Sequence, residues 1–75
     1  MLLACIVESS TVAAVAFDTE RRQLRLTFRD RSAYTYFEVP ARIYQALLDA
    51  PSKGRYFNRN VRDKFDYERS PSETD

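Results

Sequence analysis

The chain has 75 residues, of which 44% are apolar and 13% aromatic, and its formal net charge is +1. This composition is typical of one small globular domain rather than a disordered segment, and the short length leaves little room for an internal substrate cavity. Because there is no histidine and only one cysteine, the common zinc-ligand sets and an intramolecular disulfide are excluded. We therefore expect a surface function without catalytic residues, metal or cofactor.

Two apolar runs near the N-terminus predict the first strands. Residues 4–8 indicate a strand or an extended arm, and residues 11–18 a strand. Cys5 lies in the first run, where a thiol is more often a small buried hydrophobe than a nucleophile. The apolar stretch of residues 2–7 is too short to cross a bilayer and no basic segment precedes it, so we expect a cytoplasmic protein with no membrane partner.

A hairpin is predicted next. Asp18 begins a polar turn, where its side chain is placed to accept hydrogen bonds from the backbone. Apolar and polar side chains then alternate over residues 23–29, and this period of two is the clearest strand signal in the chain. A tight reversal at residues 29–32 leads into another β-rich run over residues 33–39.

The second half predicts two helices. Pro40 ends the last strand and suits the first turn of a helix. Apolar side chains recur at spacings of three and four over residues 41–50, which indicates an amphipathic helix that Pro51 ends. Ser52 is placed to cap a second helix. Gly54, the only glycine, indicates a conformational or close-packing need in its first turn.

The second helix is predicted to have two different faces. Its apolar stripe, which we expect to face the sheet, consists of Phe57, Val61 and Phe65. Its cationic stripe consists of Arg55, Arg59 and Arg62. The stripes lie about 160–200° apart at 100° per residue, so the arginines should point away from the core.

Together these elements predict an α+β fold, in which a small antiparallel sheet of three to four strands is followed by two helices on one face. We assign residues 1–68 to a single domain. Hydrophobicity falls after Tyr67, so residues 69–75 are interpreted as a disordered acidic tail.

The sequence resembles the KTSC domain, a family named after the C-terminal region of some lysyl-tRNA synthetases. The resemblance covers roughly residues 8–67 and rests on ESS, VAFD, YTYFEVP and above all APSKGRYFNRNVR. Ala16 stands where relatives often have glycine, and RDRS fills a turn that is often glycine-rich. The resemblance implies a non-catalytic module near the RNA machinery, found alone in small bacterial and phage proteins or fused to synthetases.

Eight residues are candidates for contact with a partner, and they are Tyr34, Tyr36, Lys53, Arg55, Tyr56, Asn58, Arg59 and Arg62. The two strand tyrosines could stack bases or pack beneath the helices, and packing is favoured because half-buried tyrosines are common in small sheets. The cations could pair with phosphates or carboxylates, or form a solvated helix face. Tyr56 lies at the border of the two faces, and could anchor an interface or be an ordinary border residue.

Two further groups of polar residues are expected to have structural roles. At least one of Asn58 and Asn60 should bond the backbone. The arginines of the hairpin and its turns are interpreted as a solubilising outer face, and they are Arg21, Arg22, Arg25, Arg29 and Arg31.

The leading functional hypothesis is a small regulator, not an enzyme, that binds RNA polymerase and modulates transcription, in the host cytoplasm if the protein is phage-encoded. Some phage-encoded regulators of host RNA polymerase resemble this chain in length, and its near-neutral charge favours a protein partner over nucleic acid. The alternative is an RNA-binding module related to domains appended to tRNA synthetases. No small-molecule substrate is expected.

Overall fold

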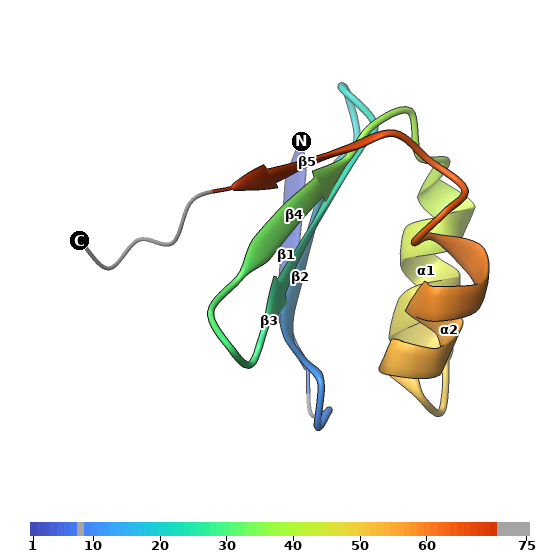
Figure 1. The fold of residues 1–75 in the computed structure, drawn as a ribbon. Coiled ribbons are helices and arrows are strands. Elements are labelled where there is room, and N and C mark those ends of the chain that lie inside the picture. The colour runs from blue at the N-terminus through green and yellow to red at the C-terminus, as the bar shows by residue number, and fades with distance from the viewer. Residues whose placement is uncertain (8, 71–75) are drawn as a thin grey trace.

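The computed structural model describes residues 1–7 and 9–70, apart from the side chain of Ser70. It consists of one antiparallel sheet with two helices on one of its faces (Figure 1). The five strands lie side by side in chain order, and both helices come between the fourth and the fifth. In chain order the elements are β1 Leu2–Ile6, β2 Val12–Asp18, β3 Gln23–Phe28, β4 Ala33–Tyr36, α1 Ala41–Asp49, α2 Lys53–Asn60 and β5 Tyr67–Ser70. The predicted α+β class is confirmed, with one strand more than expected.

Alternation along the strands builds the core. Phe17 and Leu24 are opposite each other on β2 and β3, as are Val15 and Leu26, and all four side chains are at most 1% exposed. Arg25, which lies between Leu24 and Leu26 on β3, points to the other face and is exposed. The period-two pattern of residues 23–29 therefore marks a half-buried strand, as predicted.

Aspartates shape the turns that join the strands. Asp18 Oδ1 accepts hydrogen bonds from the backbone N–H groups of Glu20 and Arg21 at 3.0 and 3.2 Å, as the sequence predicts. In the next turn, Asp30 Oδ1 accepts from the N–H and the hydroxyl of Ser32 at 2.9 and 2.6 Å. These hydrogen bonds hold the pKa of both carboxyl groups below its usual value.

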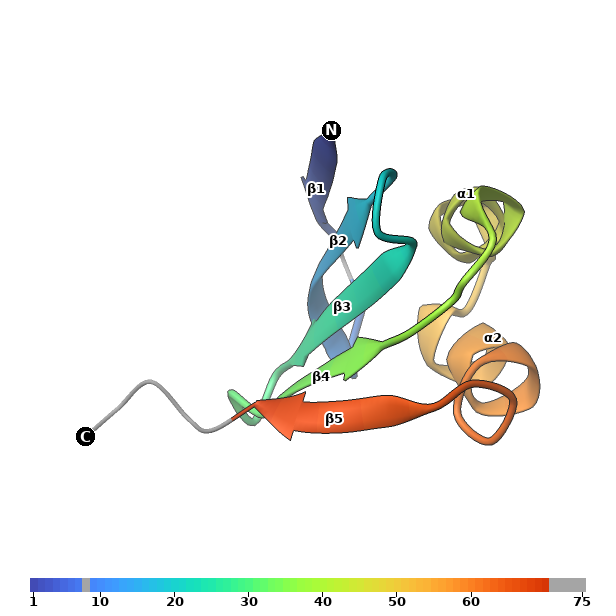
Figure 2. The same cartoon turned by 90° about the horizontal axis from the view of Figure 1, so that it is seen from above.

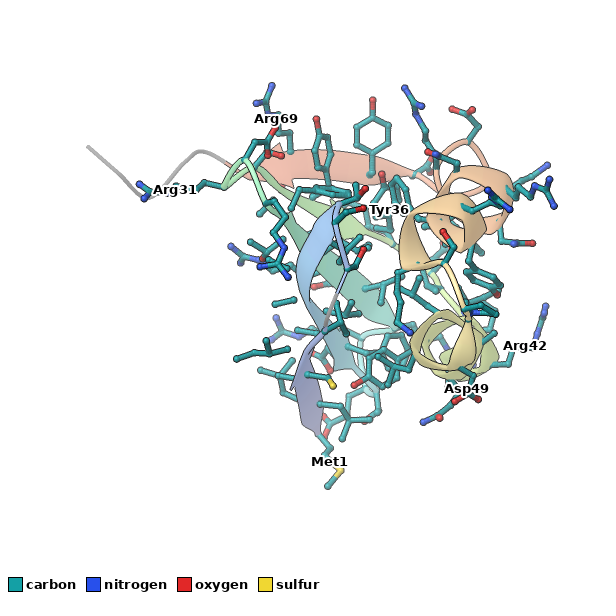
Figure 3. The ribbon with its side chains drawn as sticks, turned by 90° about the horizontal axis from the view of Figure 1, so that it is seen from below. Met1, Arg31, Tyr36, Arg42, Asp49 and Arg69 are labelled. Atoms are coloured by element: carbon teal, nitrogen blue, oxygen red, sulfur yellow. The ribbon has the colours of Figure 1, made fainter. Side chains whose placement is uncertain are left out.

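Both helices cover the same side of the sheet, and α2 is the nearer of the two to β5 (Figure 2). The inward side chains of α1 include Tyr44, which stacks on Phe17 with 5.4 Å between ring centroids, and Leu47, which is fully buried. Arg42 and Asp49 of α1 point away from the core (Figure 3). Neither helix in the described part of the chain is long and apolar enough to cross a membrane.

The second helix is shorter than the stripe of apolar residues predicts. It ends at Asn60, and Val61 leaves the helical region with φ −124°. The N–H groups of Val61 and Arg62 both donate to the carbonyl of Phe57, which closes the last turn. Phe65 still packs against the core, but from a turn rather than from the helix. After this end the chain reverses toward β4. The backbone carbonyl of Asp66 accepts from the Phe37 N–H at 2.9 Å, a contact that a longer helix would not allow.

A fifth strand follows this reversal, where the sequence predicts the start of a disordered tail. Tyr67 and Arg69 of β5 pair with Tyr36 and Tyr34 of β4. Two residues assigned to the tail, 69 and 70, are thus part of the sheet, and the remaining tail residues 71–75 lie outside the described residues. Pairing with β4 gives the backbone of this short polar segment a partner that its own sequence does not indicate.

The first strand forms one edge of the sheet and corrects an expectation about Cys5. This residue lies in a strand, as predicted, but its thiol is free and exposed rather than buried. Because β1 pairs with β2 alone in the described structure, the side chains of β1 lack a second neighbouring strand to cover them.

Candidate macromolecule-binding surface

Helix α2 begins where the sequence places its cap. Ser52 has extended backbone angles, φ −124° and ψ 106°, and its Oγ accepts from the backbone N–H of Arg55 at 3.3 Å. This bond satisfies one of the free N–H groups of the first turn. The N-cap fixes where the helix starts and hence which of its side chains face the sheet.

Aromatic contacts fix the rotation of α2 about its axis. Phe57 is 7% exposed, and its ring meets Phe28 and Tyr36 edge-on, with centroid distances of 5.4 and 5.6 Å. Val61, at the end of the helix, is fully buried. Edge-on packing of this kind is the favourable arrangement for aromatic pairs. With these side chains held inward, the opposite side of the segment must face solvent.

Two arginines of α2, Arg55 and Arg59, are exposed to solvent. The sequence predicts Arg62 on the same helix stripe, but it lies in the turn after α2, because the helix ends at Asn60. Arg62 is exposed as well, and we call the three residues together the arginine face. Within residues 1–7 and 9–70 the only ion pair joins the Met1 amine to Glu20 Oε2 at 3.0 Å. The guanidinium groups of the arginine face are therefore free to pair with an external anion.

Two shallow depressions flank Arg55. One, of about 240 Å³, lies beside the junction of the helices and is lined by Ala50, Pro51, Ser52, Arg55, Tyr56, Arg59 and Asn60. The other, of about 350 Å³, lies between α2 and the loop before β2, and is lined by Thr11, Phe28, Ser52, Gly54, Arg55, Phe57 and Asn58. The predicted residues Arg55, Tyr56 and Arg59 thus share one depression, and Asn58 lines the other.

Lys53 and Asn60 have structural roles next to this surface. Lys53 Nζ donates to the carbonyl of Ala50 at 2.8 Å and so caps the C-terminal end of α1. Asn60 Nδ2 donates to the carbonyl of Tyr56 at 3.2 Å, which confirms that one asparagine of this segment bonds the backbone. Asn58 is exposed, so its amide remains accessible.

Gly54 lies where α2 passes the loop before β2. A Cβ at this position would lie 3.4 Å from Thr11 Oγ1, which is ordinary van der Waals contact, and the φ angle is not positive. Close packing against Thr11 therefore explains the glycine only weakly, and its backbone conformation does not require a glycine.

The two strand tyrosines face the helices and belong to an aromatic cluster. Tyr36 is 2% exposed and lies between the sheet and α2 (Figure 3). Tyr34 is half-buried, and its ring centroid is 6.4 Å from that of Tyr36. Of the two interpretations of these tyrosines, packing beneath the helices describes Tyr36, whereas Tyr34 keeps part of its surface open.

The phenol of Tyr36 is perturbed by this environment. Burial, followed by the neighbouring hydroxyls of Tyr67 and Tyr34, raises the pKa of Tyr36 to about 12. Asp63 adds to the rise, while Arg62 of the arginine face opposes it. Arg62 is thus the member of the arginine face whose charge acts on the tyrosine cluster.

Sequence reasoning missed two contributors near this surface. Tyr67 of β5 is 56% exposed, and its ring centroid lies 5.7 Å from that of Tyr34. The Arg69 guanidinium lies 5.8 Å from the centroid of the Tyr34 ring, within cation–π range. The alternation of Tyr67, Glu68 and Arg69 is the only signal in the sequence, and four residues are too few to identify a strand.

One arginine assigned to the solubilising outer face has a different role. Arg29 Nε donates to the carbonyl of Ser9 at 2.9 Å, and its terminal NH2 group donates to the carbonyl of Val7 at 3.3 Å. Arg29 therefore fastens the connection between β1 and β2, whereas Arg25 lies exposed on the outer face.

Guanidinium groups are the main charged groups on this surface. Within the described ranges, no three His, Cys, Asp or Glu residues are grouped so that they could hold a metal ion. The arginine face instead offers planar donors that fit phosphate or carboxylate oxygens in pairs.

Comparison with known proteins agrees with this architecture. The family model of the KTSC domain matches residues 8–65. The chain belongs to the KTSC domain family. The KTSC domain protein of Yersinia pestis, whose crystal structure is solved, is 31% identical; the match covers 95% of this chain and all of that one, with a TM-score of 0.89. The family resemblance seen in the sequence is confirmed, and so is the fold.

Sequence relatives place KTSC domains in two settings. A lysine–tRNA ligase of Nostoc sp. is 38% identical over 61 residues, which are 81% of this chain but 11% of the ligase. The corresponding ligase of Trichormus variabilis is 36% identical and shows the same coverage. A protein of Tsukamurella paurometabola is 39% identical over 59 residues, which are 79% of this chain and 88% of the relative. The chain therefore spans a small part of the ligases and most of the small relative.

Proposed function

We propose that this KTSC domain is a non-catalytic module that binds RNA through the arginine face. The observation that carries the proposal is the exposure of three guanidinium groups along α2 and the turn after it, without a carboxylate partner in the described structure. A guanidinium group can bind two phosphate oxygens at once, which suits a nucleic-acid backbone. A solubilising role does not require this planar group. Relatives that are lysine–tRNA ligases, whose name gives tRNA as a substrate, support RNA over other polyanions.

The size of the surface limits the expected affinity. If each residue of the arginine face contacts one phosphate, the logarithm of the binding constant should fall against the logarithm of salt concentration with a slope of roughly −2 to −3. Binding of this kind is weak at physiological salt. It suits a module that adds affinity to a larger RNA-binding protein, and a free-standing domain would need contacts beyond the arginine face.

The test is a titration with tRNA at low salt, in which Arg59→Ala is compared with Arg25→Ala. Both variants lose one exposed arginine and the same charge, but Arg25 lies on the outer face of the sheet, away from the helices. We expect Arg59→Ala to weaken binding about tenfold and to reduce the salt slope by roughly one, with Arg25→Ala close to the parent. Thermal melts of both variants should match the parent, because neither side chain is buried.

Two results would contradict the RNA proposal. The first is the absence of saturable binding to tRNA or to single-stranded RNA at low salt. The second is equal weakening by the two arginine variants, since this would mean that overall charge rather than the arginine face determines the affinity.

The second candidate is a regulator that docks on RNA polymerase and modulates transcription. The net charge of +1 favours it, because a nearly neutral surface suits a protein partner better than a polyanion. The sequence alone favours this partner, whereas the tRNA ligase relatives support the RNA proposal. The test is a pull-down with purified core polymerase after nuclease treatment. If the polymerase retains the protein and RNA titrations show no saturable binding, the polymerase candidate is favoured over RNA. Both candidates require a cytoplasmic protein.

A further inference from the structure

The structure leaves one edge of the sheet open in a way that fits a second copy of the chain. We propose that two copies associate through antiparallel pairing of their β1 strands, which joins the two sheets across a twofold axis next to Ala4. This inference is independent of RNA binding, because β1 and α2, whose segment carries the arginine face, lie on different parts of the fold (Figure 2).

The hydrogen-bonding pattern identifies which backbone groups of β1 are free. The Val7 N–H donates to the carbonyl of Ala13 at 3.2 Å, and the Met1 carbonyl accepts from the Thr19 N–H at 2.9 Å. Odd-numbered residues of β1 therefore direct their backbone groups to β2. Because these directions alternate along an antiparallel strand, Leu2, Ala4 and Ile6 direct theirs to the open edge.

This open edge is complementary to itself. When Ala4 pairs with Ala4 of a second copy, Leu2 falls opposite Ile6 of that copy, and Ile6 opposite its Leu2. Each of these three residue pairs can form two backbone hydrogen bonds, so the outward N–H and C=O groups of Leu2, Ala4 and Ile6 all obtain partners. The Ile6 carbonyl accepts from the Cys5 thiol at 3.6 Å, and its second lone pair can accept from the other copy. A peptide of unrelated sequence could use the same groups, but its side chains would not match by symmetry.

The side chains agree with this register. Leu2 is 70% exposed and Ile6 is 88% exposed, and both lie on the outer face beside the small side chain of Ala4. In the proposed pairing, the Leu2 and Ile6 side chains of the two copies meet twice, at symmetric positions. Large apolar side chains that are exposed in the monomer become cross-strand neighbours in the dimer.

The two edges of the sheet differ in how they are protected. Edge strands of monomeric proteins commonly carry charged residues that discourage pairing with another chain. At the far edge, β5 carries Glu68 and Arg69. By contrast, residues 1–7 include no charged side chain, and β1 contains neither proline nor lysine. Charged side chains that discourage pairing are thus present on β5 and absent from β1.

Molar mass measured by light scattering over a dilution series tests the pairing. The parent should approach twice 8.8 kDa with rising concentration. Ala4→Pro should remain a monomer, because proline removes the outward N–H at the centre of the interface while the bonds from β1 to β2 are kept. Its thermal melt should stay cooperative, which shows that the domain itself is folded.

A pair of double variants tests the register. Leu2→Lys with Ile6→Lys places like charges opposite each other, whereas Leu2→Lys with Ile6→Glu places opposite charges across the same two contacts. We expect the dimer dissociation constant of the second variant to be lower by roughly tenfold or more.

Three results would overturn the proposal. A monomeric parent at every concentration up to about 1 mM would exclude even weak pairing. A dimer that survives Ala4→Pro would mean that another surface associates. Equal dissociation constants for the two double variants would mean that Leu2 does not face Ile6.

Discussion

Among residues 1–7 and 9–70, three residues other than glycine adopt left-handed backbone angles, and each lies at a bend of the chain. They are Arg22 with φ 57°, Arg31 with φ 74° and Glu38 with φ 56°. Arg31 is the clearest case, because its turn is closed by a bond from the Phe28 N–H to the Ser32 carbonyl at 2.8 Å. A side chain at such an angle brings Cβ close to the backbone, a strain that glycine avoids. The departure of RDRS from a glycine-rich turn is thus accommodated by strain at one arginine.

We predict that Arg31→Gly stabilises the protein by about 0.5–1 kcal/mol, since the relief of strain exceeds the greater flexibility of the unfolded chain. The melting temperature should rise by a few degrees. Arg21→Gly is the control, because Arg21 is also an exposed turn arginine but its φ is not positive. A stabilising effect of Arg21→Gly equal to that of Arg31→Gly would show that loss of charge, rather than backbone strain, is responsible.

At the scale of elements, β5 links the C-terminal segment to the core. The Tyr67 ring lies 5.4 Å from that of Tyr36 and 5.7 Å from that of Tyr34, measured between centroids. Tyr67 therefore covers the aromatic cluster on the side that the helices leave open. Through Tyr36 the cluster also contacts Phe57, so β5 and α2 support each other.

We predict that Tyr67→Ala lowers the free energy of unfolding by about 1–2 kcal/mol, because aromatic pairs contribute roughly 0.5–1.5 kcal/mol each. Urea unfolding measures the change. Glu68→Ala is the matched control, since Glu68 lies in the same strand with its side chain on the opposite face. If both substitutions are neutral, β5 does not contribute to the stability of the fold.

At the scale of the whole molecule, the Tyr36 phenol connects ionisation with stability at high pH. Its pKa in the folded protein, about 12, is above the ordinary value of 10.0, mainly because burial disfavours the phenolate. A raised pKa means that the folded state favours the protonated form. The resulting stability is present in full below pH 10.0 and is lost as the pH rises through about 12.

We therefore predict that the melting temperature of the parent falls between pH 10.0 and about 12, and that Tyr36→Phe makes this fall shallower. Tyrosinate absorbance, followed over the same range, should show a late-ionising tyrosine that is missing in the variant. Burial also raises the pKa of Tyr44, so a second late phase should remain. An unchanged late phase in Tyr36→Phe would contradict the assignment.

Features that depend on neighbours along the chain could be predicted from the sequence. Alternation over residues 23–29 predicted β3, Ser52 predicted the cap of α2, and the spacing of Arg55 and Arg59 predicted an exposed cationic side. The alternation and the arginine spacing repeat with the period of one element, and the cap is a single residue beside its helix, so a window of a few residues contains each signal.

Features that depend on contacts between distant segments became visible in the folded structure. The end of α2 at Asn60, the role of Arg29 in fastening the loop before β2 and the burial of Tyr36 all require segments that are far apart in the sequence. The same holds for β5, whose four residues become a strand because β4 offers unpaired backbone groups. Such contacts form once the chain has folded back on itself, and local periodicity has no information about which segments will meet.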